Sequence, residues 1–341
     1  MDQLVARLRT GQLYAMTGSG VSVSAGYRTW EEVVARLAAV VMERSGAGIA
    51  GIDAEVIVRT QQDPLLCAQF LSRELSPEDF ASFIRQEFRP NGKPPHELLI
   101  RLAQMPFKHI LTLNFDESME EAHDAMKLSY GKVSCSARAA TSRFLDSIDS
   151  PDCPRQIVHL HGVYTDPTET IVLTEDGYRR MYRDSNLFEH FLWLLAATKR
   201  IVFLGFGFKD IDFLNAMRDA ARDMNRDAAR DIENRNWTGH FAVLPISPTE
   251  DDVPIRRDHN YRYFVEPIFY ERVEGGDDPY ARFLPLINGI LHQLDLPARP
   301  AIEIAEPAVA AELIAEPGDL QRAADLAEQF LGKIDPGANN A

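Results

Sequence analysis

The sequence predicts an α/β protein: a Rossmann-like parallel sheet with helices on both faces and a helical insertion. Two observations support this fold class. Short apolar runs alternate along the chain with segments of helical period, which is typical of a parallel sheet covered on both faces. Four of these runs also end in glycines or polar residues, where sheets of this kind bind their ligands.

Five apolar runs are expected to form the strands. Each is short and is bounded by small or polar residues, as buried strands of a parallel sheet are. The predicted strands are residues 12–17, 109–114, 155–160, 200–204 and 240–246.

Segments with apolar residues at spacings of three and four are expected to form the helices. They are residues 30–44, 176–198, 210–224 and 280–293, together with a helix that begins at Asp116. Residues 53–105 have a mostly helical pattern that is interrupted by turns at Asp63-Pro64, Ser76-Pro77 and residues 90–95. We expect this segment to be the helical insertion.

The composition changes after residue 296 and divides the chain. We predict one catalytic domain over residues 1–296, with the insertion at about residues 53–105. Residues 297–318 are rich in Pro, Ala and Glu, as linkers are. Residues 319–341 contain an amphipathic helix and a tail, and we expect the helix to dock on a neighbouring subunit, a partner or its own core.

Charge and cysteine content argue against several classes of protein. With 36 Lys and Arg against 51 Asp and Glu, the net charge of −15 disfavours direct binding of nucleic acid. No apolar run approaches the roughly 18 residues of a membrane span, and the first residues do not resemble a signal peptide. The three cysteines are scattered, which fits reduced thiols in the cytoplasm and leaves too few for a four-thiolate zinc site.

Small and polar residues gather after four predicted strands. Taken singly, each group has a structural explanation as a turn, a helix cap or a core aromatic. The carboxyl ends of parallel strands meet at one edge of a sheet, so together the groups indicate one ligand site. They are Gly18-Ser19-Gly20, Asn114-Phe115-Asp116, His159-Leu160-His161-Gly162 and the segment from Gly205 to Asp210.

The first loop does not match a common nucleotide motif. Its Gly18-x-Gly20 pair begins like a dinucleotide fingerprint, but Val23 stands where the third glycine should be. A Gly-Lys-Ser/Thr sequence for a P-loop is also missing. The small residues nevertheless allow a close backbone approach, and Ser22 and Ser24 add hydrogen-bond donors.

Four blocks of sequence resemble the sirtuin-like family, named for silent information regulator two, and in particular its bacterial, zinc-free NAD-hydrolase branch. The likeness covers about residues 10–220, and the blocks occur in the family's order. They are GSGVSVSAGYRTWEEVV, LTLNFDESME, IVHLHG and FLGFGFKDIDF.

This resemblance implies that the catalytic domain binds NAD along its strand ends. It implies that Asn114 is the catalytic asparagine beside the nicotinamide ribose and that His161 is the general base. Asp116 would contact the nicotinamide amide. The other residues implied to bind NAD are Gly18, Ser19, Gly20 and Ser22 for the pyrophosphate and ribose, and Gly205, Phe206, Gly207 and Phe208 around the adenosine half, with Asp210 or Asp212 fixing the loop.

The two histidines compete for the role of base. His159 and His161 lie two positions apart, so on one continuous strand both side chains would point to the same face. His161 is preferred because it directly precedes Gly162, as in the family motif. His159 is then a supporting residue of the NAD site, and His159 as the base is the alternative.

The sequence departs from the family at two places. Arg28 stands where the loop usually has proline, which either loosens the loop or places a cation beside the pyrophosphate. No cysteine follows Cys153, so the zinc module of protein-deacylating sirtuins is missing. We therefore expect NAD as the substrate and no metal.

The resemblance favours an NAD+ glycohydrolase that releases nicotinamide and ADP-ribose and depletes cellular NAD in antiphage defence. The alternatives are an NAD-dependent ADP-ribosyltransferase or deacylase, and a module that senses NAD or ADP-ribose. Because an ungated NAD hydrolase would poison its own cell, we expect a homo-oligomer whose activity a partner defence protein gates.

Overall fold

The computed structural model describes residues 1–45, 63–183, 186–208, 210–225, 239–272 and 282–297. A seven-stranded sheet forms its centre, with the strand order β3-β4-β2-β1-β5-β6-β7 and every pair parallel. The strands are β1 (Leu13–Thr17), β2 (Ile110–Thr112), β3 (Gly131–Ser134), β4 (Gln156–His159), β5 (Arg200–Leu204), β6 (His240–Ile246) and β7 (Val265–Glu271). This confirms the predicted Rossmann-like fold.

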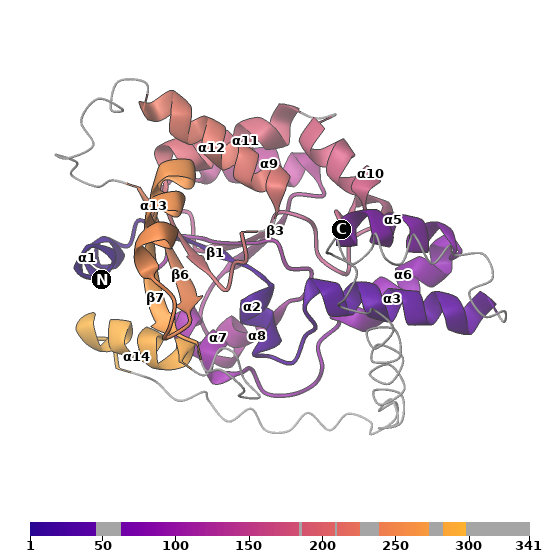
Figure 1. Cartoon of the computed structure of the whole chain (residues 1–341), viewed down its shortest axis with the longest axis horizontal. Helices are drawn as coiled ribbons and strands as arrows, with labels where there is room; N and C mark the ends of the chain where they lie inside the picture. The colour runs from indigo at the N-terminus through magenta and orange to yellow at the C-terminus, as the bar shows by residue number, and fades with distance from the viewer. Residues whose placement is uncertain (46–62, 184–185, 209, 226–238, 273–281, 298–341) are drawn as a thin grey trace, which may run out of the picture.

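Helices cover both faces of the sheet (Figure 1). One group comprises α1 (Asp2–Arg9), α7 (Glu97–Gln104), α8 (Ser118–Ala125) and α14 (Phe283–Gln293). The opposite group comprises α9 (Arg138–Ser147), α11 (Asn186–Thr198) and α12 (Ile211–Asn225). The remaining helices are α2 (Ser19–Val23), α3 (Trp30–Ser45), α5 (Pro64–Arg73), α6 (Pro77–Phe88), α10 (Glu175–Tyr178), α13 (Asp252–Tyr263), a 3-10 turn at Thr168–Thr170 and a π-turn, η2 (Arg179–Arg183).

Strand β1 shows how the sheet separates two cores. Leu13 and Ala15 pack into the cluster of α1, α7, α8 and α14, whereas Tyr14 and Met16 pack into the cluster of α9, α11 and α12. Successive side chains of a strand point to opposite faces, so a strand covered on both faces must be apolar at every position. This requirement explains why the central strands appear in the sequence as uninterrupted apolar runs.

The segment predicted as a helical insertion contains three helices in its described part. Helices α5 and α6 join α3 in a third apolar cluster beside the sheet, whereas α7 packs under the sheet itself (Figure 1). The predicted turns at Asp63-Pro64 and Ser76-Pro77 are helix starts: Asp63 Oδ1 accepts from Leu66 N at 3.0 Å and Ser76 Oγ from Asp79 N at 3.1 Å.

The domain division stays a prediction. The linker predicted for residues 297–318 lies outside the described residues except for Pro297, and the C-terminal helix and tail of residues 319–341 lie wholly outside them.

The sheet has its topological switch point at β1. From β1 the chain continues to β2 on one side and later returns to β5 on the other. The carboxyl end of β1 therefore lies where the connections diverge, which is where open α/β sheets bind ligands. The glycine-rich loop of residues 18–26 begins at this end.

Close backbone packing joins this loop to the turn after β5. The Gly18 amide donates to Leu204 O at 3.1 Å, and the Gly20 amide donates to Gly205 O at 3.0 Å. A Cβ on Gly18 would lie 2.7 Å from Gly205 O, and a Cβ on Gly205 would lie 2.5 Å from Val21 N. Gly205 also has a φ of 58°, which disfavours other residues. Gly18 and Gly205 are thus explained by the close backbone contact between the two segments.

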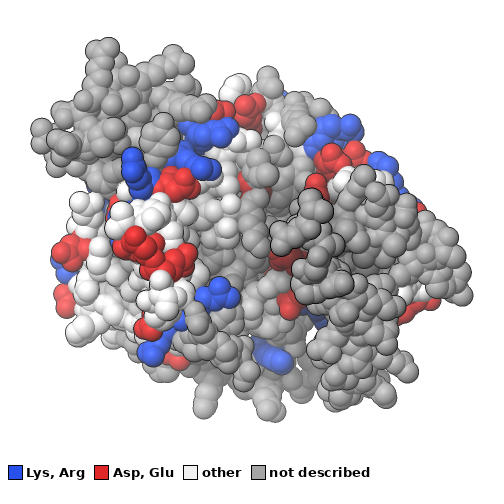
Figure 2. Space-filling view, viewed as in Figure 1, with Lys and Arg blue, Asp and Glu red and all other residues white. Residues whose placement is uncertain are grey.

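The described part of one face of the molecule mixes both signs of charge (Figure 2). On the face in Figure 2, blue Lys and Arg side chains lie among red Asp and Glu side chains and form no extended blue area in the coloured part. In the described ranges, no helix combines the length and apolar character that a membrane span requires.

Gly205→Ala tests the backbone contact. We expect it to lower the free energy of unfolding by about 2 kcal/mol or more, because alanine is strained in the left-handed backbone conformation of this position and its Cβ would clash with Val21 N. Gly289→Ala is the matched control: Gly289 lies in α14, and a Cβ there meets nothing within 4 Å. The control should gain up to about 1 kcal/mol from helix propensity. Urea unfolding measures both, and equal effects would contradict this account.

Candidate active site

Asn114 bridges the loops after β1 and β2. Its Nδ2 donates to Gly18 O at 3.0 Å and to Ser22 Oγ at 2.8 Å, and its amide N donates to Thr112 Oγ1 at 3.0 Å. These bonds fix the side-chain amide. Among the hydrogen bonds of the described residues its Oδ1 takes part in none, so this oxygen is the atom that can accept from a ligand.

Asp116 lies in a buried polar environment close to Asn114 in the chain. Its Oδ1 accepts from Ser118 N at 3.1 Å, and the hydroxyls of Ser22 and Ser118 lie 3.5 Å apart. Burial raises the pKa of Asp116 above its usual range, and the hydrogen bonds from Ser118 and Ser22 oppose that rise. The loops after β1 and β2 therefore share one continuous polar network.

His159 is a buried link between strand and helix. Its Nδ1 donates to Asn114 O at 3.0 Å and its Nε2 donates to Glu120 Oε1 of α8 at 2.7 Å. Burial lowers the pKa of His159, but the hydrogen bond and charge of Glu120 and the Asn114 carbonyl together raise it above the ordinary value. A ring that donates from both nitrogens has no lone pair to receive a proton. This arrangement argues against His159 as the base.

His161 occupies a different environment. Its Nε2 lies 2.8 Å from Tyr182 Oη and 3.7 Å from Asp210 Oδ2, and the side chain is almost fully buried. Burial lowers the pKa of His161 to about 3, so the ring is neutral at physiological pH. A neutral imidazole can accept a proton from a substrate.

The expectation that both histidines point to one face is wrong. His159 reaches α8, whose apolar residues belong to one core, whereas His161 meets Tyr182, which belongs to the opposite core. Alternation holds only within a strand, and β4 ends at His159. The chain then turns, and Gly162 follows with a φ of 90°.

Asp210 anchors the segment after β5. Its Oδ1 accepts from Phe213 N at 2.9 Å at the start of α12, and its Oδ2 accepts from Tyr178 Oη at 2.9 Å. Phe206 packs with Phe203 and Phe213 in the core, while Gly207 is exposed. The described contacts thus give Phe206 a core position at the edge of the predicted NAD site.

Arg28 lies apart from these networks. Its Nη1 contacts Glu87 Oε1 of α6 at 2.7 Å, and the Glu87 side chain is 6% exposed. The cation therefore holds the glycine-rich loop against the insertion. Ser19, another predicted ligand of the pyrophosphate, is exposed in the short helix α2.

The structure brings most of the predicted site residues together in two separate polar networks. Gly18, Ser22, Asn114, Asp116 and His159 share the first, and His161 and Asp210 lie in the second. Sequence reasoning missed the side chains that complete them, which are Ser118, Glu120, Tyr178 and Tyr182. The spacing of Tyr178 and Tyr182 on a predicted helix was the one available signal, since residues four apart share a helix face.

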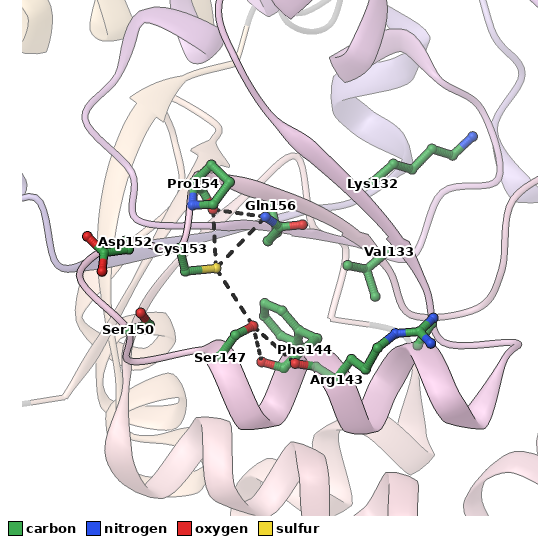
Figure 3. A pocket seen from close by; sticks show the side chains of 11 residues that line it. Lys132, Val133, Arg143, Phe144, Ser147, Ser150, Asp152, Cys153, Pro154 and Gln156 are labelled. Atoms are coloured by element: carbon green, nitrogen blue, oxygen red, sulfur yellow. Dashed lines mark hydrogen bonds between the residues drawn. The ribbon is translucent and has the colours of Figure 1, made fainter.

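A pocket of about 460 Å³ lies elsewhere, over β3, α9 and the amino end of β4. Figure 3 shows its lining, in which Cys153 points toward Ser147 and Arg143 lies at one side. None of the predicted site residues lines this pocket. Among the described residues, no group of three or more His, Cys, Asp or Glu side chains is placed to hold a metal ion.

Comparison with known proteins gives one family and two relatives. Residues 108–268 match the family model of the SIR2-like domain. The matched range includes Asn114, His161 and Asp210. The NAD(+) hydrolase ThsA of Enterococcus faecium is 25% identical over 242 residues, or 70% of this chain and 44% of that protein. Defense-associated sirtuin 2 of Bacillus subtilis is 23% identical over 233 residues, or 67% of this chain and 21% of that protein. The chain thus spans less than half the length of these curated relatives.

His161→Phe tests whether the folded protein holds a neutral histidine. Below a pH of about 6.5 the unfolded chain protonates His161 whereas the folded protein, with a pKa of about 3, does not, so wild type loses stability as the pH falls. The variant escapes this loss. The destabilisation caused by His161→Phe should therefore shrink by about 1.4 kcal/mol between pH 7.5 and 5.5.

Urea unfolding at the two pH values measures this difference. His292→Phe, at an exposed position at the end of α14, is the control and should show no such change. A destabilisation by His161→Phe that is equal at both pH values would mean that His161 titrates normally in the folded protein.

Proposed function

We propose that the chain is an NAD+ hydrolase that releases nicotinamide and ADP-ribose, because residues 108–268 match the family model of the SIR2-like domain. One observation carries the proposal: Asn114 with a fixed amide and His161 with a neutral ring lie at neighbouring strand ends beside the switch point. The similarity to a protein named NAD(+) hydrolase supports the same reaction.

The proposed chemistry needs few groups. Nicotinamide leaves the ribose through an oxocarbenium-like transition state, as in glycoside hydrolysis, and it leaves as a neutral molecule without a general acid. Water then adds to the ribose carbon and gives up a proton, for which neutral His161 is the acceptor. Asn114 Oδ1 orients the water or a ribose hydroxyl, and Asp116 contacts the nicotinamide amide.

The remaining ligand contacts belong to the same proposal. The loop of Gly18, Ser19, Gly20 and Ser22 lies along the pyrophosphate and ribose. Gly205, Phe206 and Gly207 border the adenosine half, and Asp210 fixes their segment. His159 supports Asn114 through its carbonyl and does not take part in proton transfer. No metal has a step in this reaction.

The biological setting is also proposed. The protein acts in the cytoplasm as a homo-oligomeric defence effector that depletes NAD, and a partner protein gates it. The printed name of the Bacillus subtilis relative supports a role in defence. The predicted C-terminal helix of residues 319–341 is the segment that we expect to mediate assembly or gating.

A sensor of NAD or ADP-ribose is the second candidate. The burial of His161 beneath Tyr182 favours it, because a binding module has no need of an accessible base. Chromatography of NAD after incubation with the protein separates the candidates. Nicotinamide and free ADP-ribose indicate hydrolysis, ADP-ribose on protein indicates transfer, and bound but intact NAD indicates a sensor.

We expect Asn114→Ala and His161→Ala each to abolish nearly all NAD cleavage, with a loss on the order of 10²–10⁴ for the base alone. Long incubation at high protein concentration makes the wild-type rate measurable. His292→Ala is the matched control and should keep the wild-type rate. If His161→Ala keeps full turnover while folded, His161 is not the base.

Arg28 and Glu87 provide a further test. If Arg28 also reaches the pyrophosphate, Arg28→Gln should raise the KM for NAD about tenfold, because it removes a charge-assisted hydrogen bond. Glu87→Gln breaks the same ion pair but keeps the cation, so its KM should stay near the wild-type value. Equal KM values for the two variants would mean that Arg28 holds the loop in place and does not contact NAD.

A further inference from the structure

Two tyrosines cover His161 in this structure. Both come from the short segment formed by α10 and the π-turn η2. The rings of Tyr178 and Tyr182 meet the imidazole edge-on, with centroids 5.0 and 5.9 Å away, and they stack on each other at 5.5 Å. His161 is 2% exposed and Tyr182 is 7% exposed. The proposed base is therefore closed off from solvent.

The Tyr182 hydroxyl occupies the place that the reaction requires for a substrate. A general base must come within roughly 2.6–3.2 Å of the atom whose proton it takes. Tyr182 Oη lies 2.8 Å from His161 Nε2, within that range. A water or a ribose hydroxyl cannot reach the same nitrogen while Tyr182 stays in position.

We propose that Tyr182 is an internal substitute for the substrate hydroxyl and holds the site closed. This inference rests on the proposed hydrolase function and assigns a residue to its off state. NAD reaches His161 only when the Tyr182 hydroxyl leaves Nε2. The closed state lowers the apparent affinity for NAD by the fraction of molecules in which the site is open.

The two tyrosines have different partners: Tyr178 binds Asp210, and Tyr182 binds His161. Tyr178 donates to Asp210, which also begins α12, so Tyr178 is tied to the core of the domain. Tyr182 packs edge-on against Phe188 of α11, with ring centroids 5.0 Å apart, and its described bond to His161 is a neutral one. It lies in a π-turn, a rare element that is frequently found at functional sites. In this proposal Tyr182 is the member of the pair that moves, because its hydroxyl, and not that of Tyr178, lies on His161 Nε2.

A proton relay through Tyr182 is the competing account, and it predicts the opposite sign. If the hydroxyl passes the proton onward from His161, Tyr182→Phe should lower kcat and leave KM unchanged. If the hydroxyl blocks the site, Tyr182→Phe should raise kcat/KM about threefold to tenfold, as expected for the loss of one neutral hydrogen bond. Tyr182→Ala, which also removes the covering ring, should raise it further.

The experiment combines two measurements on the full chain. The first is the initial rate of NAD cleavage as a function of NAD concentration. The second is the rate at which diethyl pyrocarbonate acylates His161, followed by peptide mass spectrometry, and it does not depend on NAD chemistry. Tyr270→Phe is the matched control, because Tyr270 is a buried tyrosine of β7 that stacks on Phe283.

We expect Tyr182→Phe and Tyr182→Ala to accelerate both reactions, and Tyr270→Phe to change neither. The urea midpoint of each variant shows that it is folded, and Tyr182→Phe keeps the test valid if Tyr182→Ala unfolds. Unchanged acylation of His161 in a folded Tyr182→Phe variant, or a fall in kcat, overturns the proposal. If the Tyr182 variants speed the acylation of His161 but no variant cleaves NAD, Tyr182 covers His161 and the proposed hydrolase function is wrong. If NAD is cleaved at the same rate with and without the Tyr182 substitutions, the hydrolase function holds and the proposed role of Tyr182 is wrong.

Discussion

The backbone contact between the loop after β1 and the turn after β5 is the constraint on which the candidate site depends. The amides of Gly18 and Gly20 are bound by the carbonyls of Leu204 and Gly205, at a spacing that a Cβ on either turn would prevent. This contact holds Gly18 O and Ser22 where Asn114 Nδ2 reaches both. The Asn114 carbonyl in turn accepts a hydrogen bond from His159, and His159 also donates to Glu120. One chain of contacts therefore runs from β5 through β1 and β2 to β4 and α8.

Two histidines at one strand end differ because their surroundings differ. His159 donates to a carboxylate and a carbonyl, and these partners raise its pKa above the ordinary value despite its burial. His161 has a tyrosine hydroxyl as its closest partner and a pKa lowered to about 3, so it stays neutral. Paired groups whose environments separate their pKa values are the usual basis for assigning acid and base roles. Of the two rings, the neutral ring of His161 is the one with a lone pair that can accept a proton in the proposed reaction.

The central strands could be predicted from the sequence because burial on both faces requires uninterrupted apolar runs. The two edge strands were missed because they lack such uninterrupted runs. Strand β3, with the sequence GKVS, is only half-buried, and β7 carries Pro267, which an edge strand tolerates because one side of its backbone is unpaired. The strand-end residues Asn114 and His161 followed from topology. The partners Glu120, Tyr182 and Glu87 did not, since each contact joins segments that lie 21 to 59 residues apart. The shared face expected for His159 and His161 failed because β4 ends between them.

The central claim is that NAD lies at the strand ends around β1, with its nicotinamide ribose between Asn114 and the position of His161. A crystal structure of the Tyr182→Ala, His161→Ala double variant with NAD tests it most directly, because this variant removes the cover and slows cleavage. The account predicts density for an intact dinucleotide along the loop of residues 18–26, with the nicotinamide ribose within hydrogen-bond distance of Asn114 Oδ1. A dinucleotide seated instead in the pocket lined by Arg143 and Cys153 would contradict it.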